Sequence, residues 1–303
     1  MSEETRSQPL FGLVLVVMAM SIIGLIDNFV VHIAAEVGLW QFHAIRSLAL
    51  CGIIWVLARG FGWRLRPVSW GAVAARSFFF STSMVLYFGS LGAMSVAQAG
   101  AGLFSSPIFV LLISALILGA GIGIWRILAV AIGFAGVLLI LKPWSDSVSV
   151  MAVLPVLAGI FYALNGIATR RWCEAESTGT LLMGLFGGLG VWGVLGTIWF
   201  TLNPFSVEVA GDFAFFTRGW VPISGPIWGW IAVQIVGSLM AVAMLTRGYQ
   251  VTEVSFVTVF EYSFLIFAGF WGIVLFGVVP DGPALLGIVL IITSGTIIAL
   301  RSR

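Results

Sequence analysis

The sequence predicts an all-α membrane protein with ten transmembrane helices, arranged as two inverted five-helix repeats. Three observations predict this fold: the composition, the length of the uncharged runs, and a pattern that recurs in both halves. Of the 303 residues, 60% are hydrophobic and only 9% are charged, whereas a soluble domain is about 45–50% apolar and about 25% charged. A soluble fold cannot bury this excess, so part of the surface must face lipid.

Apolar runs of helical length define the predicted spans. A helix needs about 20 apolar residues to cross the hydrocarbon core. No charged residue occurs from Ser77 to Trp125, a run too long for one helix, and the small residues of Gly89–Gln98 indicate a turn within it. The predicted spans are Leu10–Ala35, Leu39–Ala58, Trp70–Ser90, Ala97–Leu118, Gly123–Leu141, Val150–Thr169, Thr178–Phe200, Pro226–Leu245, Val254–Phe276 and Pro283–Leu300.

Basic residues divide the connectors between the two sides of the membrane. With the N-terminus in the cytoplasm, the outer side receives only Lys142 and Arg218. This positive-inside bias predicts a multi-pass protein of the bacterial inner membrane with both termini cytoplasmic. The long connector Asn203–Gly225, with Glu208 and Asp212, is predicted to be a water-exposed loop. The cytoplasmic side receives Arg6, Arg59, Arg64, Arg66, Arg126, Arg170, Arg171, Arg247, Arg301 and Arg303.

The chain divides into two related halves, residues 1–145 and 146–303. The fourth span contains Phe104-Ser105-Ser106-Pro107 and the ninth contains Phe260-Glu261-Tyr262-Ser263; the fifth span ends with Gly136–Lys142 and the tenth with Gly295–Arg301. These matches occur in the same order at nearly the same offset, which indicates a repeat. Five spans per half is an odd number, so the second half must enter the membrane from the opposite side. Inverted repeats of this kind are typical of secondary transporters, with the substrate site near the midplane.

A pattern of small and apolar residues runs through the fourth and fifth spans. It consists of Ala93, Ala97, Leu103, Pro107, Leu118-Gly119, Gly133 and Gly136-Val-Leu-Leu. This pattern resembles the EamA domain of the drug/metabolite transporter superfamily. The resemblance covers nearly the whole chain and implies two five-helix domains around a central cavity, which opens to each side in turn.

This chain departs from the EamA pattern at one position in each half, and its aromatic residues indicate a narrower resemblance within the superfamily. The family often carries a glutamate after the Leu-Gly of its fourth helix, where this chain has Ala120, and Val278 follows Gly277 in the second half. No role can therefore be taken over from that glutamate. The aromatic-rich helices are most similar to the YddG-type aromatic amino-acid exporters, which implies export of aromatic or hydrophobic amino acids. A multidrug or other metabolite carrier of the same fold is the alternative.

Ionisable residues within the first two spans form the principal candidate site. A charged group at the centre of a membrane costs at least about 2.5–3.5 kcal/mol, so it usually faces the interior of the helix bundle. Asp27 and Arg46 lie at similar distances from the turn between these spans, and His43 precedes Arg46 by three residues on the same helix face. Two interpretations stay open: a cluster that binds the carboxylate and ammonium groups of an amino acid, or a structural Asp27–Arg46 pair.

Further polar residues at membrane depth complete the list of substrate-binding or coupling candidates. Glu261, within the ninth span, is either a protonatable coupling group or a structural hydrogen-bonding group. The uncharged candidates either contact the solute or bond one helix to another. These are Asn28, Tyr87, Gln98, Tyr162, Asn165 and Gln234.

No catalytic residue, metal site or cofactor is predicted. The two histidines and two cysteines show no zinc-ligand spacing, and no phosphate loop or nucleophile motif occurs. Sparse polar residues disfavour a channel, although a solute channel and an intramembrane enzyme stay as alternatives. The predicted partners are the lipid bilayer and a small organic solute such as an aromatic amino acid, without nucleic acid. The sequence leaves open whether the protein acts alone or as a homodimer.

Overall fold

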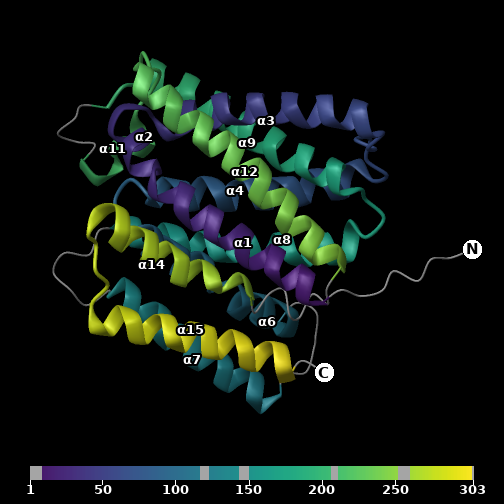
Figure 1. The fold of residues 1–303 in the computed structure, drawn as a ribbon, viewed down its shortest axis with the longest axis vertical. Coiled ribbons are helices and arrows are strands. Elements are labelled where there is room, and N and C mark those ends of the chain that lie inside the picture. The colour runs from purple at the N-terminus through teal and green to yellow at the C-terminus, as the bar shows by residue number, and fades with distance from the viewer. Residues whose placement is uncertain (1–8, 117–122, 143–149, 206–210, 252–259, 302–303) are drawn as a thin grey trace, which may run out of the picture. The chain divides into compact units, whose positions relative to one another are not determined.

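The computed structural model describes residues 9–116, 123–142, 150–205, 211–251 and 260–301, and each predicted span overlaps a helix within these ranges (Figure 1). The all-α prediction is confirmed for this part of the chain. The helices are α1 (Pro9–Asn28), α2 (Val30–Glu36), α3 (Leu39–Phe61), α4 (Trp70–Ser90), α5 (Val96–Leu103), α6 (Ser106–Leu116), α7 (Ile124–Leu141), η1 (Val150–Ala152), α8 (Val153–Trp172), α9 (Thr178–Leu202), η2 (Gly211–Phe213), α11 (Ala214–Thr217), α12 (Gly225–Val251), α14 (Ser263–Phe276) and α15 (Gly282–Arg301).

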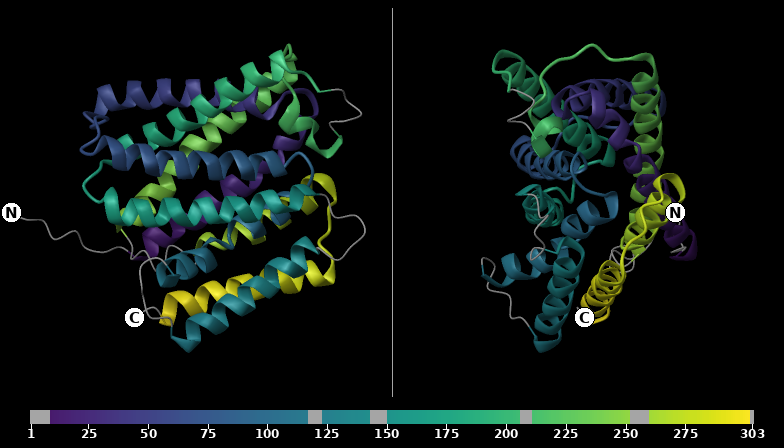
Figure 2. Two further views of the ribbon diagram at one scale, coloured as in Figure 1. Left: turned by 180° about the vertical axis from the view of Figure 1, so that it is seen from behind. Right: turned by 90° about the vertical axis from the view of Figure 1, so that its left-hand side faces the viewer.

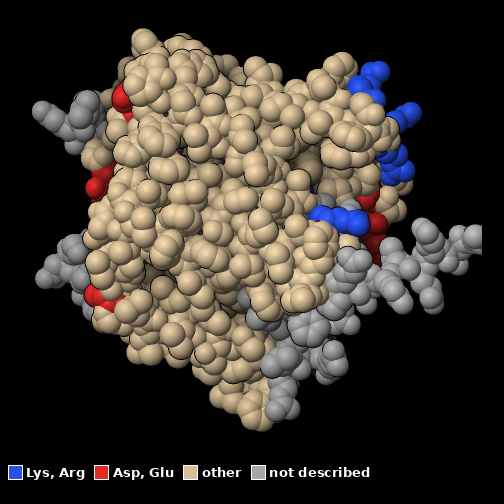
Figure 3. Space-filling model, viewed as in Figure 1, with Lys and Arg blue, Asp and Glu red and all other residues tan. Residues whose placement is uncertain are grey.

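Helix length and hydropathy identify a multi-pass membrane protein. Among the described residues, five helical stretches are long and apolar enough to cross a membrane: Leu10–Glu36, Leu39–Phe61, Val153–Trp172, Thr178–Leu202 and Gly225–Leu245. Shorter apolar helices occupy Val96–Val110, Ile127–Leu141, Ser263–Phe276 and Gly282–Ile297. The total of ten crossings stays a prediction. The surface seen in Figure 3 is largely uncharged between a few charged side chains near its edges, as a lipid-facing surface requires.

Three predicted spans are interrupted helices. The first is interrupted at Phe29, between α1 and α2, and the fourth at Phe104 and Ser105, between α5 and α6. Pro107 explains the second interruption, because its ring nitrogen cannot donate to the preceding helical turn. The ninth has a turn at Tyr262, immediately before α14, while its first residues, 254–259, lie outside the described ranges.

The described chain forms two compact units, each made of segments distant in sequence. Unit 1 comprises Met1–Asn28, Val96–Lys142 and Val236–Arg303, and unit 2 comprises Phe29–Ser95 and Pro143–Ile235. Each unit therefore takes helices from both predicted sequence halves. The division into repeats at residue 145 concerns sequence relatedness rather than contact, and it stays a prediction.

Close backbone contact between two long helices forms the core of unit 2. Helix α3 packs along α9, and α4 packs against both α8 and α9 (Figure 2). At Gly193 of α9, an added Cβ atom would lie 2.7 Å from the carbonyl oxygen of Trp40 and would also overlap the Ala44 backbone nitrogen. Glycine at this position lets the two backbones approach closely, as is usual between helices in membranes.

Reciprocal glycines join two helices of unit 1. Helices α7 and α15 pack side by side (Figure 1), and α1 packs against α14. An added Cβ at Gly136 would lie 2.7 Å from the Gly287 carbonyl oxygen, and one at Gly287 would lie 2.6 Å from that of Gly136. The Ser294 hydroxyl also donates to the Ala129 carbonyl at 2.6 Å. The fifth and tenth predicted spans are therefore tightly paired.

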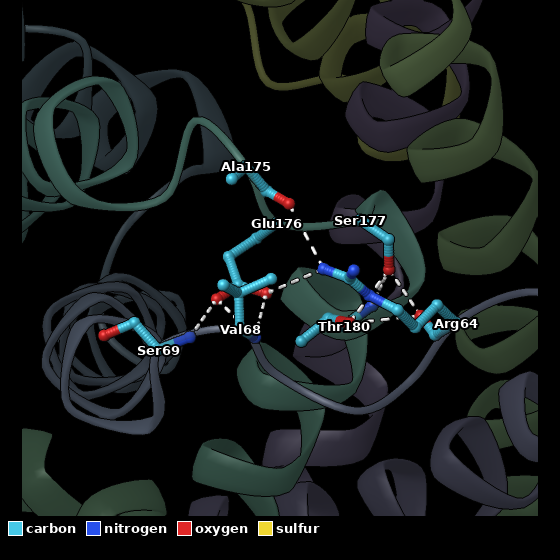
Figure 4. A network of polar contacts seen from close by, with 7 residues as sticks. All are labelled: Arg64, Val68, Ser69, Ala175, Glu176, Ser177 and Thr180. Carbon is cyan, nitrogen blue, oxygen red and sulfur yellow. Dashed lines mark hydrogen bonds and ion pairs between the residues drawn. The ribbon is translucent and has the colours of Figure 1, made fainter.

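A buried carboxylate joins two connectors of unit 2 (Figure 4). Glu176, between α8 and α9, accepts hydrogen bonds from the backbone N–H groups of Val68 at 2.9 Å and Ser69 at 2.7 Å. Its side chain is 1% exposed and lies 3.8 Å from the Arg64 guanidinium. Ser69 caps the N-terminus of α4, where a negative charge is favourable because of the helix dipole. Desolvation raises the pKa of Glu176, but the two backbone donors and Arg64 together lower it below its ordinary value.

This lowered pKa predicts a pH-dependent contribution to stability. A carboxylate with a lowered folded-state pKa stabilises the fold above its unfolded pKa, about 4.3, and loses this contribution as the pH falls through the folded value. Glu176→Gln is therefore expected to lower the midpoint of thermal unfolding in detergent by several degrees at pH 7 and by much less near pH 3. Glu174→Gln, which alters an exposed neighbouring carboxylate, is the control. An equal decrease for Glu176→Gln at both pH values would contradict the assigned role.

The long connector between α9 and α12 is more ordered than the sequence predicts. It contains η2 and α11, and its residue Phe215 is buried. The Arg218 guanidinium donates to the Ala34 carbonyl at 2.8 Å, and partial burial lowers the pKa of Arg218. Asp212 is exposed, as predicted, whereas Glu208 lies outside the described ranges. The prediction of a water-exposed loop is wrong for part of this connector, because Phe215 is buried and the ring of Phe216 packs against Trp40 of α3, whereas Phe205, Phe213 and Trp220 are exposed.

Candidate functional site

A desolvated cation lies among aromatic rings inside unit 2. Arg46 of α3 is 3% exposed, and its Nη1 donates to Gln234 Oε1 of α12 at 3.1 Å. The guanidinium carbon lies 5.1 Å from the ring centre of Phe42 and 4.6 Å from that of Phe88. Cation–π attraction and the amide hydrogen bond together compensate in part for the loss of water around the charge. The structure thus brings together two predicted site residues that are distant in sequence.

His43 extends this cluster along α3. Its side chain is fully buried, and within the described residues neither ring nitrogen has a hydrogen-bond partner. The imidazole lies edge-on to the Phe88 ring, with 5.1 Å between ring centres, and Phe88 in turn contacts the predicted site residue Tyr87 at 5.3 Å. A buried polar group without a partner is costly, so His43 offers a donor and an acceptor to a bound solute or water.

Two predicted site residues, Tyr162 and Asn165, lie on α8, which packs against α4. The ring of Tyr162 lies 5.5 Å from that of Phe80, edge-on. Asn165 is buried, and its carbonyl oxygen accepts from the Thr169 hydroxyl at 2.8 Å. Arg76 of α4 also donates to that hydroxyl, at 3.2 Å. The Tyr162 contact joins two helices and the Asn165 contact lies within one, which fits a role in bonding the helix bundle together.

The remaining candidates lie in unit 1. Asp27 and Asn28 are buried at the end of α1, where the Asn28 amide donates to the Gly24 carbonyl at 2.6 Å and to the Ala268 carbonyl at 3.4 Å. Gln98 of α5 is partly buried, and Glu261 is buried. Asp27 and Arg46 belong to different units, so the predicted ion pair between them stays a prediction.

Two helix interruptions meet inside unit 1. Phe104, at the interruption between α5 and α6, lies 6.0 Å from the ring of Tyr262, at the turn before α14. Phe104 also contacts the ring of Phe264 at 5.3 Å. Glu261 and Ser263 flank this turn, and within the described residues the buried Ser263 hydroxyl has no partner. Interrupted helices at corresponding places in two repeats often form the solute or ion sites of transporters.

Part of this arrangement could not be found from residue type alone. Phe42 and Phe88 are two of 24 phenylalanines, and only the fold shows that they enclose Arg46. Gln41 is polar and lies in a predicted span, but its importance is visible only from its contact with the long connector. For the interruption at Phe104, the sequence does contain a signal, because the nearby Pro107 is a helix-breaking residue.

Comparison with known proteins identifies relatives that are all transporters. Riboflavin transporters from Rhizobium johnstonii and Vibrio cholerae are 29% and 27% identical over 214 and 198 residues, which cover 69% and 65% of this chain. These matches span 63% and 60% of the two transporters' own length, less than two thirds. A pseudopaline exporter from Pseudomonas aeruginosa is 27% identical over 93% of this chain and 94% of its own length.

A solved structure and a family match complete the comparison. One protein crystal structure aligns with 96% of both chains at a TM-score of 0.65 and 15% identity, which shows a shared fold alone. The relatives named above are transporters rather than enzymes. Specific similarity to aromatic amino-acid exporters stays a prediction. The broader resemblance is confirmed over part of the chain, because residues 10–142 match the EamA-like transporter family.

Proposed function

We propose that this protein is a secondary carrier that exports a small organic solute across the bacterial inner membrane by alternating access, with both termini in the cytoplasm. The observation that carries the proposal is the contact between Arg46 and Gln234, which joins the two predicted repeats through a buried guanidinium. A charged group at membrane depth is costly and usually functional. Here it lies beside an amide and two aromatic rings, a set suited to an anionic, partly aromatic solute.

The helix pairing supports the inverted repeat on which alternating access depends. A two-fold axis relating the halves would place the second span against the seventh and the fifth against the tenth. Helix α3 packs on α9, and α7 packs on α15. The third span packs against the sixth, α4 on α8. The two-fold axis would relate this pair to contact between the eighth span and the first. In agreement, Gly237 of α12 lies against Ile26 of α1.

The proposed solute is an aromatic or hydrophobic amino acid, or another organic anion with a ring. Arg46 would bind the carboxylate, because a guanidinium forms paired, charge-assisted hydrogen bonds with that group. Phe42 and Phe88 would contact the ring, and His43 would supply a further donor or acceptor. Riboflavin and a pseudopaline-type compound are the competing solutes, since the relatives named above carry them.

Uptake into liposomes tests the proposal. Purified protein would be reconstituted and presented with labelled L-tryptophan, L-phenylalanine, L-leucine, riboflavin, a nucleoside and a cationic drug, each with and without a pH gradient. We expect saturable uptake of at least one aromatic anion or zwitterion, and little uptake of the cation. Saturable uptake of the cationic drug alone would reject Arg46 as the solute-binding group and favour a multidrug carrier.

Glu261 is proposed as the group that couples transport to protons. Glu261 is buried, and it immediately precedes the turn at Tyr262. Glu261→Gln is expected to reduce gradient-driven uptake at least about tenfold, because the variant cannot bind and release the proton. Exchange of labelled for unlabelled solute at equal pH should persist in the variant. Gradient-driven uptake at the wild-type rate in Glu261→Gln would remove the coupling role.

A channel or an enzyme would require features that the described residues do not display. A selective channel needs a polar pore lining or filter, and the buried polar groups here lie in separate clusters. No group of three or more potential metal-ligating residues occurs among the residues that the structure describes. Saturation and stereoselectivity of uptake would separate a carrier from a channel. The protein is proposed to need no cofactor, and its oligomeric state does not enter the mechanism.

A further inference from the structure

We propose that Gln41 is a positioning residue for the Arg46 site, an inference that rests on the proposed function. The Gln41 side chain is fully buried near the start of α3. Its Nε2 donates to the Val221 carbonyl at 2.8 Å, and its Oε1 accepts from the Val221 N–H at 3.0 Å. One amide thus satisfies both backbone groups of a connector residue, which fixes that residue in distance and in orientation.

Val221 lies immediately upstream of the helix that carries Gln234. Helix α12 begins at Gly225, and Gln234 follows nine residues later, about 13.5 Å along the axis at 1.5 Å per residue. Arg46 follows Gln41 by five residues on α3, about 7.5 Å along its axis. Helices transmit position over such distances with little distortion. The Gln41–Val221 pair therefore sets where Gln234 meets Arg46.

Neighbouring contacts hold the same connector but do not replace this one. Trp40 Nε1 donates to the Phe216 carbonyl at 2.6 Å, further from the start of α12. The Trp220 N–H donates to Thr201 Oγ1 of α9 at 2.7 Å. The second contact orients the connector against α9, whereas Gln41 orients it against α3, the helix that carries Arg46. Thr201 is therefore a matched control, with a similarly short bond to the adjacent residue but without a direct link to α3.

A ligand-free double-mutant cycle tests the positioning role. The coupling between Arg46→Met and Gln234→Leu would be measured from unfolding equilibria in mixed micelles. In the wild-type background we expect the two changes to interact by about fivefold in the unfolding constant, or about 1 kcal/mol. In a Gln41→Leu background this coupling should fall below about twofold, because Gln234 no longer lies in place. In a Thr201→Val background it should be unchanged.

An isosteric variant keeps the test decisive if Gln41→Leu does not fold. Gln41→Glu retains the acceptor for the Val221 N–H but places a second oxygen against the Val221 carbonyl, so it should also lower the coupling. Full coupling in Gln41→Glu, or an equal loss in Thr201→Val, would overturn the proposal. For uptake of L-tryptophan and riboflavin, Gln41→Glu should raise KM with little change in maximal rate. In a Gln234→Leu background, the same substitution should cause no further increase in KM.

The two proposals fail in different ways. If Arg46→Lys and Gln234→Leu leave uptake of every tested compound unchanged, the Arg46 site is not the transport site. The unfolding cycle still decides whether Gln41 positions Gln234. If the single variants impair uptake but the effects of Gln41→Glu and Gln234→Leu are independent, the transport site stands and only the positioning role is rejected.

Discussion

Replacing Arg46 by glutamine is expected to lower solute uptake about 10- to 100-fold while the protein still folds. The guanidinium is proposed to bind the solute carboxylate, and a hydrogen bond to a charged group contributes about 1.5–3 kcal/mol, which corresponds to that range. The substitution removes a buried charge and retains an amide that can reach Gln234, so the loss of stability should be small. The measurement is initial uptake into liposomes at matched protein incorporation.

Arg46→Lys separates charge from shape in this prediction. Lysine keeps the positive charge but cannot stack flat against Phe42 and Phe88 or form a paired bond with a carboxylate. An intermediate loss of uptake, expressed as a higher KM, is expected. Wild-type uptake in Arg46→Gln, with a folded monodisperse protein in detergent, would show that Arg46 has only a structural role.

Placing a methyl group at Gly193 is expected to destabilise unit 2 by about 1–3 kcal/mol, the usual cost of overpacking. The added Cβ would overlap backbone atoms of Ala44 and the Trp40 carbonyl of α3, and backbone atoms cannot rotate away as side chains do. Helices α3 and α9 would have to separate. The measurement is the unfolding midpoint of Gly193→Ala in detergent.

The same helix provides the matched control for this substitution. Gly187, also in α9, has no atom within 4 Å of an added Cβ. Because alanine is the better helix former, Gly187→Ala should be neutral or stabilising by up to about 1 kcal/mol. Equal effects at the two positions would contradict the close backbone contact between α3 and α9.

Most of the helical framework could be predicted from the sequence, because lipid imposes a simple rule. Each spanning segment must satisfy its own backbone hydrogen bonds, so long apolar runs become helices. The turn at Glu36–Gly38 and the helix over Trp70–Ser90 follow directly from this rule. Neither the interruption at Phe29 nor the one at Phe104 was predicted, although Pro107 is a helix breaker near the second and the first has no such residue nearby.

The candidate site was predicted only as separate residues. Arg46 and Gln234 attract attention because polar groups are rare at membrane depth, but their contact depends on how α12 packs against α3. The long connector shows the same limit. Its charged residues suggested exposure to water, whereas the buried Phe215 ring and the Gln41 amide bond hold part of it against other segments of unit 2. Pairing between distant segments depends on tertiary packing, which local patterns do not encode.

Counterflow is the most direct test of a carrier. Liposomes containing the protein would be loaded with a high concentration of the unlabelled solute identified by the uptake panel, and entry of a trace of labelled solute would be followed. Alternating access predicts that the internal solute accelerates labelled uptake and produces a transient accumulation, which Arg46→Gln abolishes. Labelled uptake that is unaffected by internal solute and rises linearly with concentration would contradict the proposed mechanism.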